Sequence, residues 1–376
     1  GLGDVYKSQV RWYMISNSNP WDNLKFDKEG VAEVKRKFFG TLQNVYSFFS
    51  LYANIDNFKY EEDKIDFVKR PELDRWIISE LNSLVKKVDY NLENYDLTPA
   101  AREINDFVQE KLSNWYVRLS RRRFWKGEYN QDKISAYQTL HECLIKISKL
   151  ISPIAPFYSE YVFQSLNIIS KQEDAKSVHL SSFPDIIPEL INKKLEKKIN
   201  QVRNICSLAL SIRKKEKIRQ PLNKIIIPVK SENEKEEIEN AKSQILSEIN
   251  VKSIEFLDKK DSLLVKELKP KFKLLGPRYG KIINAVAKEI KQLSNTEIEK
   301  LEIEGSINLS VENTDVIISN DDVEINYKDI EGLSVATDGS QTIALDLKLN
   351  EELVNEGITR EIVNRVQNIR KNQGYD

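Results

Sequence analysis

Residues 114–126 read Asn114-Trp115-Tyr116-Val117-Arg118-Leu119-Ser120-Arg121-Arg122-Arg123-Phe124-Trp125-Lys126, which places four arginines and four aromatic residues within a few helical turns. Arginine pairs with phosphate through a planar fork and also stacks on flat rings. Tryptophan and tyrosine offer faces on which unpaired bases stack. The stretch therefore indicates either a nucleic-acid surface or a structural helix held by salt bridges, and both interpretations are open at this point.

Helical phase divides this stretch into two faces. The apolar residues that lead into it follow helical steps: Ile104, Val108, Leu112, Trp115 and Leu119. With Leu119 at the centre of the buried stripe and about 100° per residue, Arg118, Arg121 and Trp125 point away from the core. These three are the candidates for contact with RNA. Arg122, Arg123 and Lys126 lie closer to the core, and we expect Arg122 and Arg123 to extend along it or to pair with carboxylates there.

The first 170 residues predict long helices. One apolar stripe, at steps of three and four, holds Val31, Val34, Phe38, Leu42, Val45, Phe49 and Tyr52. Further helices are predicted after Pro71, from a cap at Thr98-Pro99, over 136–151, and from Pro156. Long helices with short connections favour an antiparallel all-α bundle. We expect it to span residues 26–170, with residues 1–25 as the end of a preceding domain.

The pattern changes after the bundle. Residues 171–220 predict a loop and then a long basic helix from Glu189 to Arg219. Residues 221–376 predict a strand–helix–strand unit over 224–257, five short β runs between 307 and 347, and a last helix capped by Asn350. Pro228 places the first strand at a sheet edge, or lies at that strand's end. The predicted fold class is multidomain, with an all-α helix bundle, a basic helix and a C-terminal α+β region.

Charge is segregated, although 58 Lys and Arg balance 58 Asp and Glu. Residues 193–219 carry a net charge of +8, and residues 295–331 carry −9. A local basic field steers a polyanion whatever the total charge. We therefore select a second candidate RNA surface at the end of the basic helix, formed by Arg213, Lys214, Lys215, Lys217 and Arg219. A solvated run of charges is the alternative.

A third candidate contact lies in the C-terminal region. Arg278 and Lys281 are framed by Gly276, Pro277 and Gly280, and glycine allows a phosphate to approach the backbone closely. The alternative is a turn at a helix start that carries surface charge.

The composition argues against catalysis and metal binding within this chain. Cys143 and Cys206 form no CxxC pair and no cluster with histidine, so neither a zinc site nor a disulfide framework is predicted, which is typical of a reducing compartment. His141 and His179 are predicted to be structural. No apolar stretch approaches the roughly 20 residues of a membrane span.

Several stretches together are similar to one enzyme family. They are Asn114 to Lys126, Arg11-Trp12-Tyr13-Met14-Ile15-Ser16, Asn19-Pro20-Trp21-Asp22-Asn23-Leu24, Lys35-Arg36-Lys37-Phe38-Phe39-Gly40-Thr41-Leu42, Arg70-Pro71-Glu72-Leu73-Asp74-Arg75-Trp76, Ser177-Val178-His179-Leu180, Arg219-Gln220-Pro221-Leu222, Leu275-Gly276-Pro277-Arg278-Tyr279-Gly280-Lys281, and Glu356-Gly357 with Arg360-Glu361-Ile362-Val363-Asn364-Arg365-Val366-Gln367. The chain resembles, from about Arg11 to its end, the anticodon-binding part of the isoleucyl-tRNA synthetases, which are class I aminoacyl-tRNA synthetases.

The resemblance also has gaps. The family's HIGH-type and KMSKS-type motifs and its editing domain belong upstream of Arg11 and are absent. The resemblance therefore implies a C-terminal fragment that is inactive by itself and holds no cofactor. Residues 1–9 match the family poorly. The paired-cysteine zinc module of one bacterial branch is missing, and the α+β tail is more similar to the eukaryote-like branch.

By resemblance, the full enzyme is a cytoplasmic ligase that joins isoleucine to its tRNA with ATP and Mg²⁺. This chain would bind the anticodon arm of the isoleucine tRNA and contact the catalytic domain of the same full-length chain, as a monomer without membrane contact. The alternative is a protein-interaction scaffold that binds no RNA. Salt-sensitive tRNA binding separates the two.

Overall fold

The computed structural model describes residues 2–126, 128–229, 231–258, 264–311, 314–329, 332–338 and 341–374. The chain divides into two compact units, Gly1–Ile199 and Asn200–Asp376, and each is described by itself. The division falls inside helix α9 (Lys193–Lys215), whereas the sequence predicted boundaries at residues 170 and 220. The start of α9 packs with unit 1 because Glu196, which is buried, accepts hydrogen bonds of 2.6 Å from the hydroxyls of Ser79 and Ser83.

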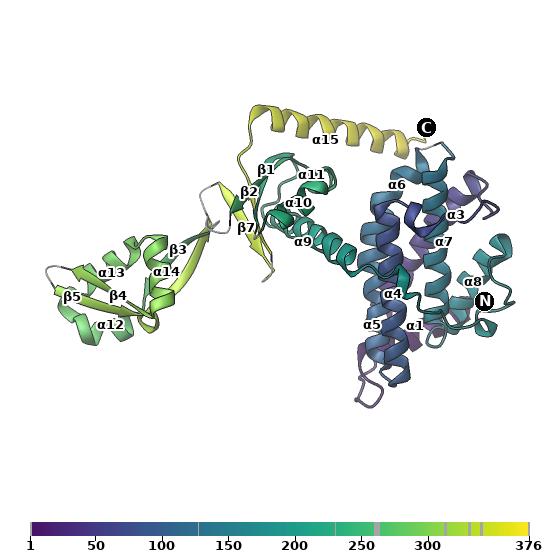
Figure 1. The fold of residues 1–376 in the computed structure, drawn as a ribbon, viewed down its shortest axis with the longest axis horizontal. Coiled ribbons are helices and arrows are strands. Elements are labelled where there is room, and N and C mark those ends of the chain that lie inside the picture. The colour runs from purple at the N-terminus through teal and green to yellow at the C-terminus, as the bar shows by residue number, and fades with distance from the viewer. Residues whose placement is uncertain are drawn as a thin grey trace. The chain divides into compact units, whose positions relative to one another are not determined.

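Unit 1 is a bundle of helices, as predicted (Figure 1). Its α-helices are α1 (Leu2–Asn17), α2 (Lys28–Val34), α3 (Gly40–Ile55), α4 (Glu72–Glu93), α5 (Leu97–Asp106), α6 (Arg118–Trp125), α7 (Gln131–Ile151), α8 (Pro156–Ser170) and the start of α9. Two π-helical stretches, Lys35–Phe39 and Phe107–Val117, join α2 to α3 and α5 to α6. Short 3-10 turns cover Phe67–Lys69, Val178–Leu180 and Pro188–Leu190.

Side-chain caps start two helices of unit 1, α2 and α7. The Asp27 carboxylate accepts from the backbone N–H groups of Glu29 and Gly30, and Asn130 caps α7 in the same way. The predicted cap at Thr98 is wrong, because α5 begins one residue earlier at Leu97. Thr98 is instead buried, and its hydroxyl lies 2.6 Å from the carbonyl oxygen of Ile15. It thereby ties the start of α5 to α1.

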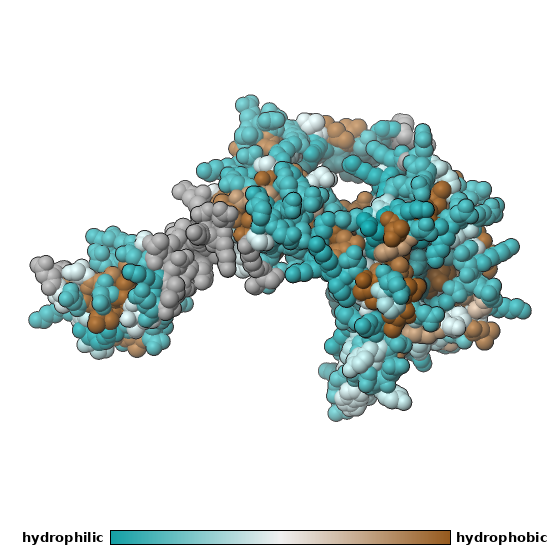
Figure 2. All heavy atoms as spheres, viewed as in Figure 1, coloured by the Kyte–Doolittle hydropathy of each residue, from teal (hydrophilic) through white to brown (hydrophobic). Residues whose placement is uncertain are grey.

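Aromatic rings form much of the core of unit 1. The ring of Trp12 stacks on Phe38 with centroids 4.2 Å apart. Tyr137 of α7 is stacked by Phe58 at 4.7 Å and met edge-on by Phe124 at 5.0 Å. Such rings bury large apolar areas and add directional ring contacts. On the face shown in Figure 2, hydrophilic residues cover most of the surface, and hydrophobic residues gather in patches over the helices.

Unit 2 contains the predicted strand–helix–strand unit. Strands β1 (Leu222–Val229) and β2 (Val251–Asp258) pair in parallel, and α10 (Glu232–Asn240) and α11 (Lys242–Ile249) connect them. With β7 (Leu333–Thr337) and β8 (Thr342–Asp346) they form a sheet in the order β2-β1-β8-β7. β1 is therefore an inner strand, and the prediction that Pro228 places it at a sheet edge is wrong. Pro228 lies at its end instead, beyond Ile225 and Ile226, where β8 pairs.

A second group of elements in unit 2 surrounds its own hydrophobic core. β3 (Leu264–Pro270) pairs antiparallel with β6 (Val323–Asp329), and β4 (Ser306–Val311) pairs with β5 (Thr314–Ser319). Helices α12 (Phe272–Tyr279), α13 (Ile283–Gln292) and α14 (Asn295–Glu304) complete the group. Its buried core includes Leu268, Leu275, Val286, Ile290, Leu301 and Val316. β3, α12 and α14 were not predicted, because their sequences are strongly charged or interrupted by Pro277.

The last helix, α15 (Glu351–Asn372), is capped by Asn350 as predicted. Leu353 near its start is buried. Arg360 donates a hydrogen bond of 2.5 Å to the side-chain oxygen of Asn250. The later apolar residues of α15 are exposed, namely Ile358, Ile362, Val363, Val366 and Ile369.

Candidate nucleic-acid interface

The arginine and tryptophan run lies on α6 and on the π-helical stretch before it. Arg118, Arg121 and Trp125 are exposed, as predicted, and 53% of the Trp125 side chain is accessible. Arg122 and Lys126 are exposed as well. The prediction that these two lie close to the core is therefore wrong. The guanidinium carbon of Arg118 lies 6.0 Å from the ring centroid of Trp115.

The π-helical stretch Phe107–Val117 explains the error in phase. A π-helical turn closes i→i+5 hydrogen bonds, so it takes up more residues than an α-helical turn. A constant 100° per residue therefore fails across it. The buried residues of the run are Trp115, Tyr116, Val117, Ser120 and Phe124, and Leu119 is only half-buried. With Ser120 as the centre of the stripe, Arg122 turns outward and Arg123 turns inward.

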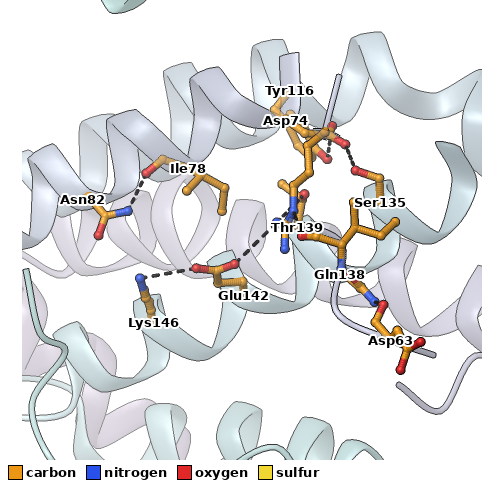
Figure 3. Close-up of polar contacts among 12 residues, drawn as sticks. Asp63, Asp74, Ile78, Asn82, Tyr116, Ser135, Gln138, Thr139, Glu142 and Lys146 are labelled. Atoms are coloured by element: carbon orange, nitrogen blue, oxygen red, sulfur yellow. Dashed lines mark hydrogen bonds and ion pairs between the residues drawn. The ribbon is translucent and has the colours of Figure 1, made fainter. Parts of the chain in front are cut away.

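Arg123 belongs to a buried polar network centred on Asp74 of α4, which has no exposed surface. Its guanidinium donates two hydrogen bonds to the Asp74 carboxylate, at 2.6 and 2.9 Å. The same carboxylate accepts from the hydroxyls of Tyr116 at 2.9 Å and Ser135 at 2.6 Å. Figure 3 shows Tyr116 and Ser135 converging on Asp74 from different helices. The prediction that Arg123 pairs with a carboxylate inside the bundle is confirmed.

The pKa shifts in this network keep both Tyr116 and Arg123 protonated, so that both remain hydrogen-bond donors. Burial, together with the nearby charge of Asp74, raises the pKa of Tyr116 well above its usual value, so its hydroxyl remains a donor. Burial opposes the charge of Arg123, but its hydrogen bonds to Asp74 hold its pKa above the usual range. Charge-assisted bidentate pairs of this kind fix geometry strongly. The network therefore sets which residues of α6 face outward.

A second polar network fixes the segment that follows α3. Arg70, which is buried, donates to the Thr139 hydroxyl at 3.0 Å and to the carbonyl oxygen of Ile65 at 3.1 Å. The Gln138 side chain accepts from the backbone N–H of Ile65 and donates to the carbonyl oxygen of Asp63 (Figure 3). These bonds attach residues 63–70 to α7.

One of the five residues of the second candidate surface, at the end of α9, is not exposed. Arg213 is buried, donates to the carbonyl oxygen of Gln220, and its Nη1 has no partner among the described residues. Burial and the charge of Arg360 lower its pKa. Lys214, Lys215, Lys217 and Arg219 are exposed. The helix ends at Lys215 rather than at Arg219, because Lys217 adopts a left-handed backbone with φ of 56°.

The two residues of the third candidate contact, Arg278 and Lys281, differ in their surroundings. The Nη1 atom of Arg278 lies 2.8 and 2.9 Å from the two carboxylate oxygens of Asp322, and its Nη2 donates to the carbonyl oxygen of Ile317 at 2.8 Å. The hydrogen bond to Asp322 raises the pKa of Arg278. These contacts favour the structural alternative for Arg278. Lys281 is exposed, and its contact with phosphate stays a prediction.

Asp322 organises this corner of unit 2 and gives a testable expectation. Its carboxylate accepts from the backbone N–H and the hydroxyl of Ser319, at 2.9 and 2.8 Å, besides Arg278. We expect Asp322→Ala to lower the free energy of unfolding of unit 2 by about 2 kcal/mol, because a turn cap and a charge-assisted bond are lost together. Urea denaturation followed by circular dichroism measures this. The exposed neighbour Asp321→Ala should stay within about 0.5 kcal/mol, and equal effects of the two changes would contradict the assignment.

Comparison with known proteins gives the interface a context. Residues 74–229 match the family model described as the anticodon-binding domain of tRNA ligase. An isoleucine–tRNA ligase from Bacteroides thetaiotaomicron is 49% identical over 369 residues, which are 98% of this chain and 32% of that protein. The isoleucine–tRNA ligase of Porphyromonas gingivalis is 50% identical over the same shares, and isoleucine–tRNA ligase 2 of Bacillus cereus is 38% identical over 96% of this chain and 34% of its own length. Nearly the whole chain is thus similar to about one third of these isoleucine–tRNA ligases.

The chain spans about one third of the length of these relatives. Its matched anticodon-binding domain starts at Asp74 and ends in β1, so it includes the Asp74 network and α6. The names of the relatives do not distinguish branches of the family, so the eukaryote-like branch stays a prediction. A solved complex of a leucyl-tRNA synthetase from Agrobacterium radiobacter K84 aligns with a TM-score of 0.34 and 14% identity, over 67% of this chain and 28% of that chain. A similarity this low supports no inference about the fold.

The described part of the chain contains no group of three or more His, Cys, Asp or Glu side chains placed to hold a metal ion. Both cysteines are buried and are not joined in a disulfide. Among the same residues, no helix is both long and apolar enough to cross a membrane. His179 lies in a 3-10 turn, where its Nε2 is 3.2 Å from the carbonyl oxygen of Pro156.

Two features of the interface were not predicted from the sequence. Asp74 lies on α4, which α5 separates from the arginine run, and the burial of a charged residue in a first helical turn is not predicted by the sequence. A signal was present in the triplet Arg121-Arg122-Arg123, since three consecutive residues cover about 200° of a helix and one of them can turn towards the core, where it needs a carboxylate. The outward position of Arg122 and Lys126 depends on the π-helical stretch, for which the sequence carries no simple mark.

Proposed function

We propose that this chain binds tRNA through its helical unit and recognises an anticodon arm on behalf of an isoleucine–tRNA ligase. The observation that carries the proposal is the exposed face of α6, with Arg118, Arg121, Arg122, Trp125 and Lys126. This face lies on a helix whose rotation is fixed by the buried pairing of Arg123 with Asp74. The match of residues 74–229 to the anticodon-binding domain of tRNA ligases supports it.

The chemistry of this face suits a single-stranded RNA loop. Guanidinium groups make forked hydrogen bonds to phosphate oxygens and fix the register of the strand. An exposed indole such as that of Trp125 provides a platform on which an unstacked base can lie. In an anticodon loop the bases can be splayed out and read at their edges. The α6 face thus combines phosphate positioning with stacking.

Unit 2 supplies further cations in this proposal. Lys214, Lys215, Lys217 and Arg219 at the end of α9, and Lys281 after α12, are exposed and would contact phosphates without reading sequence. Arg213 and Arg278 are assigned structural roles, because each is engaged by neighbouring groups of the chain.

The activity of the whole protein is also a proposal. We propose that it joins isoleucine to its tRNA, as the names of the relatives state for those proteins. ATP and Mg²⁺ would then bind in the two thirds of the ligases that this chain does not match. No residue of this chain is assigned a catalytic role, and we expect the chain to act as a monomer.

Substitution of Arg121 tests the proposal. We expect Arg121→Ala to weaken binding of a fluorescein-labelled isoleucine tRNA about three- to tenfold at low salt, and to flatten the slope of log Kd against log salt by roughly one unit, because one phosphate contact is lost. Fluorescence anisotropy at four salt concentrations measures both quantities.

The matched control is Arg121→Lys, which keeps the charge and loses only the fork. Its salt slope should equal that of the unsubstituted chain, with a smaller loss of affinity. If Arg121→Ala left both the affinity and the slope unchanged, α6 would not be the RNA face. If the unsubstituted chain bound no tRNA, the protein-interaction scaffold would be the better interpretation.

A further inference from the structure

A groove of about 300 Å³ lies on unit 1, beside the helical rod that carries the α6 face. The rod is the unbroken run of α5, the π-helical stretch Phe107–Val117 and α6 (Figure 1). Three residues of the rod line the groove, namely Arg102, Asn105 and Gln109. The opposite walls come from α1, α2 and the π-helical stretch Lys35–Phe39, and include Tyr13, Ser16, Asn17, Gly30, Glu33 and Lys37.

The groove residues and the α6 face lie in one row along this rod. Residues three or four apart share a face of an α-helix, and in a π-helical stretch the step grows to four or five because each turn takes up more residues. These steps connect Arg102, Asn105, Gln109, Asn114, Arg118, Arg121 and Trp125. Asn105 and Gln109 are half-buried and the others are exposed. A molecule that lies along the rod therefore meets both the α6 face and the groove.

Contacts within the chain fix the walls of the groove. Arg102 donates from Nε to the carbonyl oxygen of Ser16 at 2.9 Å and from Nη2 to that of Asn17 at 2.8 Å, which ties α5 to the end of α1. Gly30 lets α2 approach the ring of Tyr13, because a Cβ atom at this position would lie 2.5 Å from Cε2 of that ring. The groove is therefore formed before any ligand binds.

The groove offers polar groups that the described residues do not use. Gln109 donates from Nε2 to Oδ1 of Asn105 at 2.7 Å. This bond leaves the Gln109 carbonyl oxygen as an acceptor and the Asn105 amide group as a donor, and the Nη1 atom of Arg102 also makes no hydrogen bond within the described part of the chain. Arg102 and Lys37 are the cations of the lining, and Glu33, which pairs with Lys37, is its anion. The groove thus combines a guanidinium with amides that both donate and accept.

These groups suit the backbone of double-stranded RNA. Such RNA is recognised mostly through phosphates and 2′-hydroxyls in its wide, shallow minor groove. A 2′-hydroxyl donates and accepts, as the amides of Asn105 and Gln109 do, and a guanidinium pairs with phosphate. The carboxylates of Asp106 and Glu110 are also exposed on the rod and repel phosphate along its middle. Phosphate contacts are therefore expected at the two ends of the row.

The length of the rod identifies which part of an RNA reaches the groove. At 1.5 Å per residue, Arg102 lies at most about 28 Å along the rod from Arg121. One strand of a B-form duplex presents a phosphate about every 3.4 Å of its axis, so this length corresponds to roughly eight nucleotides. An RNA whose unpaired loop lies on α6 therefore reaches the groove through the paired stem that closes the loop.

We propose that the groove lined by Arg102, Asn105 and Gln109 binds the sugar–phosphate edge of a base-paired RNA stem whose loop contacts α6, an inference that rests on the proposed function. Arg102 pairs with a phosphate of the stem, and the two amides pair with 2′-hydroxyls. These contacts position the RNA and carry no sequence information.

Two fluorescein-labelled RNA hairpins test the proposal with the full chain. Both carry the same loop of seven unpaired nucleotides, and their stems have four and ten base pairs. The unsubstituted chain should bind the longer hairpin about tenfold more tightly, because stem contacts add to loop contacts. Arg102→Ala should lose most of this advantage and flatten the salt slope of the longer hairpin by roughly one unit, with binding of the shorter hairpin unchanged. Gln109→Ala should weaken the longer hairpin about threefold without changing the slope, since no charge is removed.

Arg11→Ala is the matched control. Arg11 is exposed and donates to the carbonyl oxygens of Ile154 and Pro153, as Arg102 does to two other carbonyl groups, but it does not line the groove. Its variant should bind both hairpins like the unsubstituted chain, and thermal unfolding by circular dichroism verifies that every variant is folded at the assay temperature.

Three results would overturn the stem groove while leaving the proposed function intact. They are equal binding of the two hairpins by the unsubstituted chain, an unchanged preference for the longer hairpin in both groove variants, and a loss in Arg11→Ala as large as that in Arg102→Ala. Absence of binding to either hairpin by the unsubstituted chain would overturn both the groove and the proposed function.

Discussion

Replacement of Asp74 by alanine is expected to lower the free energy of unfolding of unit 1 by about 3 to 5 kcal/mol, the range found when one partner of a buried ion pair is removed. Asp74 is fully buried and accepts hydrogen bonds from Arg123, Tyr116 and Ser135. Without it, a largely buried guanidinium and two hydroxyls lose their acceptor, and each such loss costs free energy. Urea denaturation followed by circular dichroism measures the change.

Glu103→Ala provides the control for this prediction. Glu103 pairs with Lys87 on the surface of the same bundle, where the two side chains are 37% and 54% exposed. Exposed pairs contribute about 1 kcal/mol or less, so this variant should unfold nearly like the unsubstituted chain. If Asp74→Ala cost no more than Glu103→Ala, the network would not be what sets the rotation of α6.

The second large effect is a loss of stability in mild acid that depends on His141. Burial lowers the pKa of His141 from 6.5 to about 4. Between these values the unfolded chain binds a proton at His141 that the folded chain does not bind. The contribution of neutral His141 to the free energy of unfolding is therefore fully present above about pH 6.5 and is lost as the pH decreases towards 4. The shift corresponds to about 3 kcal/mol across this window. Urea denaturation at pH 7.5, 6.5, 5.5 and 4.5 gives the slope.

His141→Leu tests the assignment of that slope. It removes the titrating group from a site bordered by the rings of Phe49 and Tyr60, so the pH dependence between 6.5 and about 5 should largely disappear. Glu160 and Glu196 have lowered pKa values and contribute below their usual 4.5. A variant with the same slope as the unsubstituted chain would show that His141 is not buried in its neutral form.

Local periodicity predicted the helical unit well, because each long helix buries a continuous apolar stripe. The stripe from Val31 to Tyr52 appears as α2, a π-helical stretch and α3. Outward positions for Arg118, Arg121 and Trp125 also followed from phase. The same reasoning failed at Arg122 and Lys126, since the π-helical stretch before α6 changes the rotation per residue and leaves no compositional trace.

Contacts between residues far apart in the sequence could not be predicted. Asp74 and Arg123 are 49 residues apart, and β3 pairs with β6 across more than 50 residues of chain. No local pattern specifies such partners. Arg213 illustrates the same limit. Its place at a basic helix end predicts exposure, whereas in the fold its side chain is buried, donates to the carbonyl oxygen of Gln220 and lies near the charge of Arg360. Charge composition alone therefore overestimates a nucleic-acid surface.

The candidate interface combines a rigid support with an adaptable surface. Buried bonds from Arg123 and Tyr116 hold α6, and exposed arginines and Trp125 lie on its other side. Stacking of a base on the exposed Trp125 would add to contacts that otherwise only position phosphates. This division of roles predicts that salt-dependent and salt-independent parts of RNA affinity are separable by substitution.

One titration tests the central proposal most directly. The full chain is titrated against two tRNAs that differ only in the anticodon, one for isoleucine and one for another amino acid, at 50 and 200 mM salt. We predict tighter binding of the isoleucine tRNA at both concentrations, and weaker binding of both tRNAs at the higher salt, as phosphate contacts require. Binding that is absent, or that ignores both the anticodon and the salt, would contradict anticodon recognition by this chain.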